Sequence, residues 1–381
     1  MKNAFNSSTA VLASAVQTAL GGMFGQQGRI MTLSTVAGPE ALLAESLRAT
    51  EGLSEGFGLD VSALSLDAAI PLKTLIGQPA LVELGAARFG APRAFHGHVT
   101  VAEQVGYMEF YKKRRQQFLT ESAYASTINF YMKTACPGYL EEIASSTLDP
   151  SDRWRNSYAY ADTQFMIFML KYTAGQSLEE LRKELNLVVE AYELTSKYVQ
   201  EHAENSDFPP LRFVEIDEYE RVLQMISFCF LLHRQDLLPR LAAIFDPSSA
   251  GIDTLYEDLL AFGMEDRFEI NRWCHNIPYR DLVNCLYRDK EKYCIEDLKK
   301  YLKVWYTSFS VAPWYDSHLD ISNDFCGGYF GYWSIEAAAI AYLLGVDDSS
   351  LRECIVYPSD LVDFARQFDL EKLQTESNST I

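Results

Sequence analysis

Two clusters of acidic side chains are the residues of this chain with the clearest potential for chemistry or binding. One, at the start of a predicted helix, is Glu215, Asp217, Glu218 and Glu220, and the other, around Gly263, is Glu257, Asp258, Glu265 and Asp266. Paired carboxylates serve as acid and base in some hydrolases, but no spacing here selects that reaction. Negative charge at a helix N-terminus is itself favourable by about 0.3–1 kcal/mol. Two interpretations therefore stay open: a solvated face, or a surface that binds a basic partner.

Other residues that could carry chemistry are arranged less favourably. His96 and His98 would share one face of a predicted strand, and His318 lies between Asp316 and Asp320 in the sequence. We interpret both arrangements as structural. The chain contains no common motif for a nucleophile, a catalytic zinc ion, a nucleotide phosphate or a dinucleotide. We therefore expect no enzymatic activity, no metal and no cofactor.

The charge of the chain is strongly negative and unevenly distributed. The 381 residues carry a net charge of −19, and 48% of them are hydrophobic, enough for more than one core. Residues 1–106 contain six Lys/Arg and eight Asp/Glu, a net charge of −2, whereas the rest contain 27 and 44, a net charge of −17. Such a field repels nucleic acid and anionic membranes and favours a basic partner. Ordinary solubility is the alternative explanation.

Cysteine usage and the N-terminus bear on the compartment. Seven cysteines are scattered without Cys-x-x-Cys spacing, and Cys229 stands between Phe228 and Phe230. This pattern predicts buried free thiols in a reducing compartment. Residues 11–24 are mildly apolar, but polar residues and glycines interrupt them, and no run reaches the ~18 apolar residues of a membrane span. We expect a cytoplasmic protein without a membrane partner.

Alternating apolar residues predict a β-rich region over residues 29–106, after a weakly ordered lead-in at residues 1–28. Candidate strands cover residues 29–35, 59–63, 80–84 and 93–101. Glycine and proline residues at 77–79 and 90–92 predict turns between them. Residues 29–106 are thus expected to form a domain of their own.

Helical periodicity begins after residue 106. One apolar stripe is formed by Trp154, Tyr158, Ala161, Phe165, Phe168 and Tyr172. Ser177 and Glu180 form a capping box before the next helix. A loop at residues 205–210 separates two predicted helical domains, 107–204 and 211–367, and a tail follows at 368–381. The predicted fold class is multi-domain α+β, with a short β-rich N-terminal segment followed by packed antiparallel helices.

A glycine-rich aromatic turn leads into an alanine-rich helix near the C-terminus. The turn contains Gly331, Tyr332 and Trp333, and Glu336 lies in the first turn of the helix that follows. Ser334 is a candidate N-cap for this helix, and Gly345 is a candidate stop. The alanines of the helix allow another element to approach closely. The whole motif is predicted to be structural.

This motif resembles the C-terminal half of PoNi proteins, the immunity partners of PoNe DNase toxins. The matching residues are Gly331-Tyr332-Trp333-Ser334 with Glu336, then Asp347-Asp348-Ser349-Ser350, then Tyr357-Pro358 with Asp360. The N-terminal half of PoNi proteins is similar to Arg114-Arg115, Tyr158–Asp162 and Ser177–Leu181. Over about residues 107–367 the resemblance implies an immunity protein that binds a cognate basic DNase toxin in the cytoplasm and needs no catalysis.

Residues 20–106 resemble a second family, the beginning of VgrG, the spike protein of type VI secretion. The similar segments are Arg29-Ile30, Leu75–Pro79 and Phe95–Thr100. The long spike body of VgrG does not follow, because the chain becomes helical after residue 106. The resemblance implies a fusion remnant or a tether to a secretion spike.

Two further functions stay open from the sequence. The chain could be an adaptor of the type VI secretion machinery, docking on a spike through its N-terminal segment. It could also be a secreted enzymatic effector, which the absence of a catalytic arrangement opposes. A toxin gene beside this one would favour the immunity function over both alternatives.

Overall fold

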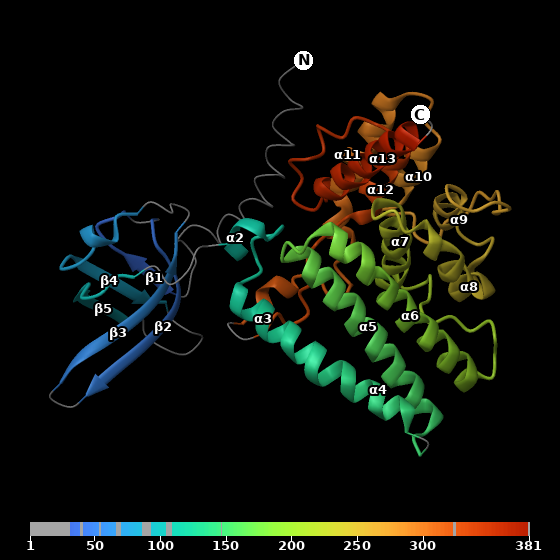
Figure 1. Ribbon diagram of the computed structural model, residues 1–381. Coiled ribbons are helices and arrows are strands. Elements are labelled where there is room, and N and C mark those ends of the chain that lie inside the picture. The colour runs from blue at the N-terminus through green and yellow to red at the C-terminus, as the bar shows by residue number, and fades with distance from the viewer. Residues whose placement is uncertain are drawn as a thin grey trace. The chain divides into compact units, whose positions relative to one another are not determined.

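The computed structural model describes residues 31–38, 41–52, 55–65, 70–85, 93–103, 109–145, 147–322 and 325–379. The chain divides into two compact units, Met1–Met108 and Glu109–Ile381 (Figure 1). Strands occupy the first unit and helices the second, so the predicted fold class is confirmed. The lead-in predicted at residues 1–28 lies outside the described residues. The finer division of the helical part at residues 205–210 stays a prediction.

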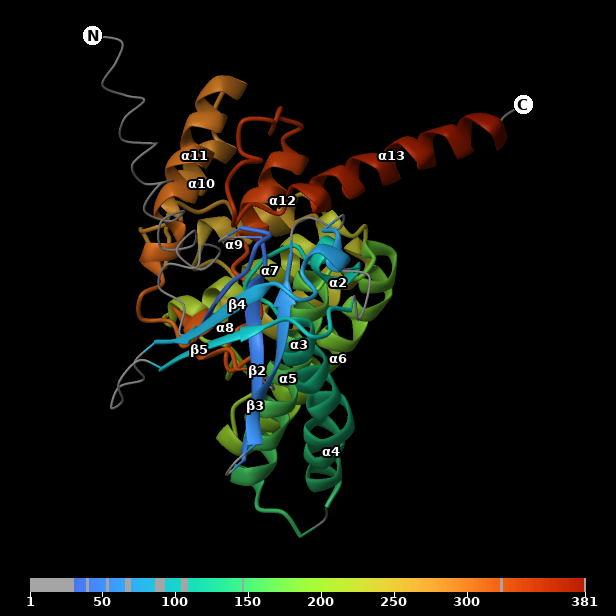
Figure 2. The same cartoon turned by 90° about the vertical axis from the view of Figure 1, so that its left-hand side faces the viewer.

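The N-terminal unit contains a three-stranded antiparallel sheet and a hairpin. The sheet has the order β1 (Met31–Ser34), β4 (Pro79–Leu84) and β5 (Arg93–His98), and the hairpin joins β2 (Leu43–Gly52) to β3 (Glu55–Leu64). Figure 2 shows β2 and β3 of the hairpin side by side. Leu33, Ala44, Val82 and Phe95 form the small core of this unit. The strands predicted at 29–35, 59–63, 80–84 and 93–101 all overlap observed strands, whereas β2 was not predicted.

Within the described residues, the helical unit is built from twelve α-helices. Their bounds are α2 (Glu109–Lys113), α3 (Glu121–Phe130), α4 (Cys136–Ala144), α5 (Pro150–Thr173), α6 (Leu178–Ala203), α7 (Ile216–Leu231), α8 (Leu238–Ser249), α9 (Thr254–Ala261), α10 (Arg280–Leu286), α11 (Glu291–Ser308), α12 (Ile335–Leu343) and α13 (Ser359–Ser379). A π-helical turn, Tyr131–Ala135, joins α3 to α4.

Helices α5 and α6 run side by side (Figure 1). The predicted apolar stripe of α5 faces the core, where Phe168 and Tyr172 contact Phe228 of α7. Phe165, Phe168 and Tyr172 are buried on α5. The predicted capping box is confirmed, because the Glu180 N–H donates to Ser177 Oγ at 3.3 Å and the Ser177 hydroxyl donates to Glu180 Oε2 at 2.9 Å. These bonds set the start of α6 and fix where its apolar face begins.

Helices α7 and α12 form the centre of the helical unit and pack against each other. Every residue of Tyr219–Leu231 on α7 is buried except Arg221. On α12 the side chains from Ile335 to Ala341 are fully buried. The alanines of α12 therefore allow close approach, as the sequence predicts, and the two helices share one core.

Two expectations about local structure require correction. Ser334 occupies the N-cap position of α12, but its hydroxyl makes no capping bond to the backbone; it lies 3.5 Å from Glu336 Oε1 instead. Cys285 and Cys294 form a disulfide, although free thiols were expected throughout. These cysteines belong to α10 and α11, which contact each other, so tertiary packing brings together two thiols that the sequence spacing does not pair.

Candidate functional site

The aromatic turn is buried in the helical unit. Tyr332, Trp333 and Glu336 are 5%, 4% and 0% exposed. Gly331 has a φ of 110°, and a Cβ atom there would lie 2.2 Å from Thr173 Oγ1, so only glycine fits. The Trp333 indole N–H donates to the same hydroxyl at 2.9 Å. The turn therefore contributes packing, and its side chains offer a partner almost no surface.

Gln116 holds this turn in place, although the sequence analysis did not select it. Its side chain is 2% exposed. Gln116 Nε2 donates to the Tyr332 carbonyl at 2.6 Å, and Gln116 Oε1 accepts from the Tyr332 N–H at 2.9 Å and from the Tyr329 hydroxyl at 2.8 Å. The amide thus satisfies backbone groups that water does not reach. In the sequence, only its position next to Arg115 could have indicated this structural role of Gln116.

Arg115 and Asp360 connect the two ends of the PoNi-like region. Arg115 Nε lies 2.5 Å from Asp360 Oδ2, and the Tyr172 hydroxyl donates to Asp360 Oδ1 at 2.7 Å. The Arg115 guanidinium also lies over the Tyr172 ring, 4.4 Å from its centroid. Residues from the first and last motifs of the resemblance are therefore in direct contact, which gives the motifs a shared structural role.

Glu336 and Glu220 are two buried carboxyl groups that influence each other. Glu336 Oε1 accepts from the Tyr301 hydroxyl and, at 3.0 Å, from the Trp305 indole N–H, whereas its Oε2 has no hydrogen-bond partner among the described residues. Burial raises the pKa of Glu336 to about 7. Burial and the neighbouring Glu336 charge raise the pKa of Glu220 well above its ordinary value. Ionising both carboxyl groups at this buried site would cost free energy, because the two negative charges repel each other.

The first acidic cluster is only partly on the surface. The Glu215 side chain is 49% exposed and the Glu218 side chain 15%, and both pair with Arg212, at 3.4 Å and 3.6 Å. Asp217 is half-buried. Glu220 is 4% exposed, so its carboxylate does not face a partner. The start of α7 thus presents less free negative charge than the sequence pattern indicated.

Glu257, from the second acidic cluster, is also inside the protein. It is 1% exposed, and its Oε2 lies 2.7 Å from Arg267 Nε. Its Oε1 accepts from the Gly251 N–H at 2.7 Å. Arg267 also pairs with Asp246 at 2.7 Å, and only 8% of its side chain is exposed. Glu257 therefore holds the loop after α9 against the helices.

The other three members of this cluster reach the surface. Asp258 is half-buried and accepts from the Tyr287 hydroxyl, at 2.8 Å and 3.0 Å to its two oxygens. Burial raises the pKa of Asp258 above its ordinary value. Glu265 and Asp266 are exposed, and neither forms an ion pair with any described residue. Of the eight predicted toxin-binding residues, Glu265 and Asp266 combine an exposed carboxylate with no ion pair to any described residue.

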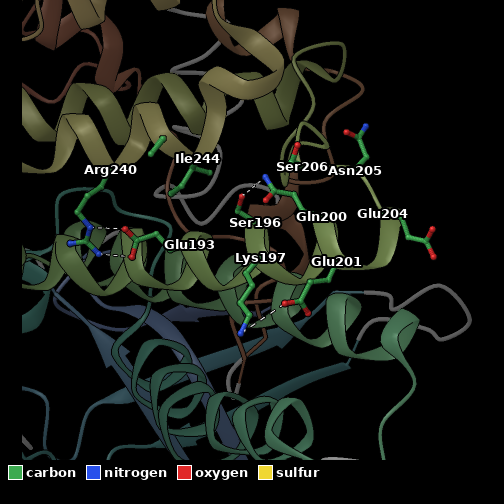
Figure 3. Close-up of a pocket in the computed structure, with 11 residues that line it drawn as sticks. Glu193, Ser196, Lys197, Gln200, Glu201, Glu204, Asn205, Ser206, Arg240 and Ile244 are labelled. Atoms are coloured by element: carbon green, nitrogen blue, oxygen red, sulfur yellow. Dashed lines mark hydrogen bonds and ion pairs between the residues drawn. The ribbon is translucent and has the colours of Figure 1, made fainter.

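A groove of about 600 Å³ between α6 and α8 is lined by paired polar side chains (Figure 3). Arg240 forms a 2.6 Å contact with Glu193, and Lys197 lies 4.0 Å from Glu201. Among the residues that line this groove there is no nucleophile beside a general base. The groove therefore offers no arrangement that would catalyse a reaction.

The described part of the chain has neither a metal-binding cluster nor a membrane-spanning helix. In it, no group of three or more His, Cys, Asp and Glu side chains is placed to hold a metal ion. His318 instead contacts the aromatic turn, with Nδ1 2.8 Å from the Tyr332 hydroxyl, and burial lowers its pKa. None of the described helices combines the length and the apolar character that crossing a membrane requires.

Sequence comparisons match two parts of the chain to two families. Residues 251–361 match the family of PoNe immunity proteins (PoNi), C-terminal. Residues 50–125 match the phage tail baseplate hub family (GPD). Both resemblances found in the sequence, to PoNi proteins and to the spike and hub proteins, are confirmed. The hub match extends past the β-rich unit into α3.

A comparison of folds adds one solved structure. The crystal structure of protein PA2201 from Pseudomonas aeruginosa superposes with a TM-score of 0.51 and 21% sequence identity, over 67% of this chain and 92% of that chain. At this level of identity the similarity shows a shared fold alone. No curated protein matches this sequence.

Proposed function

We propose that this chain is an immunity protein that binds and neutralises a cognate DNase toxin of a bacterial secretion system. The observation that carries the proposal is the match of residues 251–361 to the PoNi family. The net charge agrees with this proposal, because the part of the chain after residue 106 has a net charge of −17. A DNase must attract phosphate and is therefore basic near its site. An acidic partner meets it faster and more specifically than a neutral one.

Binding alone accounts for this function. A partner that covers the DNA path of the toxin prevents cleavage without any chemistry of its own. The protein would act in the cytoplasm, where a delivered DNase reaches the chromosome. Glu215, Asp258, Glu265 and Asp266 are the candidates for contact, because each reaches the surface and only Glu215 among them is in an ion pair.

Co-expression tests the proposal. Cells that express the DNase domain encoded beside this gene should lose viability and chromosomal DNA, and expression of the full chain should restore both. Purified chain should also inhibit DNA cleavage by that domain in proportion to complex formation. Cell death that continues with abundant, folded chain present would refute the immunity function.

A second candidate function rests on the hub match at residues 50–125. The N-terminal unit would attach the chain to a secretion spike, and the helical unit would act as an adaptor. Deleting residues 1–106 separates the two functions. Protection that survives this deletion while association with the spike protein is lost would assign one role to each unit.

A further inference from the structure

Exposed aromatic rings and a carboxylate meet on one surface of the helical unit, where α9 contacts α10. Tyr287 follows α10 and is 64% exposed, and its hydroxyl bonds to Asp258 on α9. Phe262 lies one helical turn after Asp258, at the C-terminal end of the same helix, and is 44% exposed. Residues four apart on a helix share a face. Asp258, Phe262 and Tyr287 therefore form one patch, which we call the aromatic–acidic patch.

The side chains of this patch are already oriented in a way that favours binding. The bond between Tyr287 and Asp258 joins residues 29 positions apart and fixes the direction of an otherwise exposed ring. An aromatic side chain that is already oriented loses little conformational entropy when a partner covers it. Burial, followed by the Asp258 bond, raises the pKa of Tyr287 to about 12, so its hydroxyl stays a donor at physiological pH.

Negative charge surrounds the patch, while Arg267 and Arg288 near it are paired with carboxylates. Glu265 and Asp266 are exposed in the loop after α9, and Glu269 lies close enough to Tyr287 to contribute to its raised pKa. Arg267, in the same loop, points inward to Glu257 and Asp246, and 8% of its side chain is exposed. The loop therefore presents a more negative charge to solvent than the net charge of its residues indicates, because the Arg267 charge is directed inward.

Arg288, next to Tyr287, is occupied as well. Its Nε donates at 2.6 Å to Asp297, a carboxylate that is 1% exposed. Asp297 also accepts from Lys300 Nζ at 2.6 Å, so this carboxylate is shared by two cations. The guanidinium is thus less available to repel a basic partner than an unpaired arginine would be.

We propose that the aromatic–acidic patch is the anchor of the surface that binds a basic protein domain. The inference rests on the proposed function, in which that domain is a DNase. Exposed aromatic rings within a charged rim have the composition of interface hot spots. Lysine and arginine side chains of the partner would lie over the Phe262 and Tyr287 rings, while Glu265, Asp266 and Glu269 attract them.

The start of α7 is the competing surface. Val214 and Ile277 are 75% and 66% exposed there, and a contact of 2.8 Å between His275 Nε2 and the Phe213 carbonyl brings their segments together. The acids at this end are shared with Arg212, so they offer a basic partner less free charge. For this reason we place the anchor at the aromatic–acidic patch.

Binding to the inactive DNase domain encoded beside this gene tests the inference. Tyr287→Ala should raise Kd about 30-fold and Phe262→Ala about 10-fold, as the loss of central aromatic contacts does. Tyr287→Phe should cost less, because it removes only the bond to Asp258. Glu265→Lys should slow association several-fold and weaken its dependence on salt.

Matched controls keep the result specific. Phe130→Ala changes an exposed phenylalanine on α3, and Glu141→Lys reverses an exposed acid on α4; both should leave Kd within about twofold. Circular dichroism and melting temperature establish that each variant is folded. Glu265→Lys, at a fully exposed site, stays informative if Phe262→Ala does not fold. Hen lysozyme, a basic protein of unrelated function, measures non-specific attraction.

The outcomes separate the two proposals. If the wild-type chain neither binds nor inhibits the DNase domain, the proposed function fails and the inference fails with it. If the wild-type chain binds and the Tyr287, Phe262 and Glu265 variants bind equally well, the function stands and the patch is not the anchor. Weakened binding by Val214→Ser alone would place the anchor at the start of α7 and would likewise overturn the inference.

Discussion

Glu220 illustrates how burial changes the role of a single residue. In the sequence it is one of four acids at the start of a helix. In the structure its side chain is 4% exposed, accepts a bond from Gln224 Nε2 at 3.1 Å and faces the Glu336 charge. The residues that pack around Glu220 are core residues, so its side chain does not reach solvent. Glu257 is buried for a similar reason, beside Arg267.

The Glu220–Glu336 pair predicts a pH dependence of stability. Both carboxyls have raised pKa values in the folded state, so folding favours their protonated forms. The contribution of Glu336 is complete below the ordinary pKa of about 4.5 and is lost as the pH rises through about 7. Glu220, whose pKa is also raised, acts in the same direction. Between pH 5 and 8 the free energy of unfolding should fall by about 1–3 kcal/mol.

Urea unfolding at several pH values measures this effect. Glu220→Gln removes one of the two charges and should flatten the fall in stability, whereas Glu215→Gln, at the exposed N-cap of α7, should leave it unchanged. Identical pH profiles for the wild type and Glu220→Gln would rule out the pair as the cause.

Trp333→Ala should destabilise the protein by about 3–5 kcal/mol, because a buried indole leaves a large cavity. The change also removes the donor to Thr173 Oγ1 and the edge-on contact with Tyr172, whose ring centroid lies 5.0 Å away. Trp273→Ala, at a half-exposed position, is the control. Melting temperature should fall before affinity for the toxin changes. Lost binding at an unchanged melting temperature would instead move Trp333 into the interface.

At the scale of elements, the loop after α12 ties that helix to α13. Gly345, with φ of 64°, follows the end of α12, as the sequence predicts. Asp348 is 1% exposed and accepts from Arg352 at 3.1 Å, from Arg366 on α13 at 2.8 Å and from the Tyr357 hydroxyl at 3.1 Å. The acidic motif of the PoNi resemblance is thus an anchor for the last helix.

Asp348→Asn should destabilise the helical unit by about 1–2 kcal/mol, because Arg366 loses its buried counter-charge while Arg352 keeps its pair with Asp363. Burial alone would raise the pKa of Asp348, but the bonds from Arg366 and Arg352 outweigh it and lower the pKa. The stabilisation is therefore present above the ordinary value of 3.8 and is lost as the pH falls below it.

Limited proteolysis and urea unfolding provide the measurements. In Asp348→Asn, α13 should be cleaved faster than in the wild type. Asp347→Asn changes the exposed neighbouring residue and should behave as the wild type does. Equal cleavage rates for the two variants would show that Asp348 does not hold α13.

At the scale of the whole molecule, the chain joins a small β-rich unit to a larger helical one. The helical unit is held together by contacts between distant segments: Arg115 with Asp360, Gln116 with Tyr332, and Gln224 with the Trp333 carbonyl at 3.0 Å. The first two of these contacts cross the loop at residues 205–210. They predict that the helical unit unfolds as a single cooperative body.

Residues 109–381 alone should therefore fold with one sharp unfolding transition and protect cells against the DNase as the full chain does. Residues 109–204 alone should not fold, because they lack Tyr332, Trp333 and Asp360. Circular dichroism during urea unfolding and a viability assay provide the measurements. A stable, helical 109–204 fragment would instead support two separate domains within the helical unit.

Sequence reasoning was most accurate where local chemistry decides the structure. The stripe on α5, the capping box at Ser177 and the stop at Gly345 are set by residues within one or two turns. Strand β2 was missed because its sequence, LAESLRATEG, carries charged residues and good helix formers. Its hairpin partner β3 follows closely in the sequence, but the core residues Leu33 and Val82 that it packs with come from other strands.

The sequence by itself determined the fold class, the PoNi resemblance and the excess of acid after residue 106, because composition, periodicity and motifs are local properties. Only the tertiary structure decided which acids face solvent. Glu220 and Glu257 are buried, whereas Asp258, Glu265 and Asp266 reach the surface, although all five belong to the same two sequence clusters. The direction of a side chain depends on what packs around its helix, and those neighbours come from distant parts of the chain.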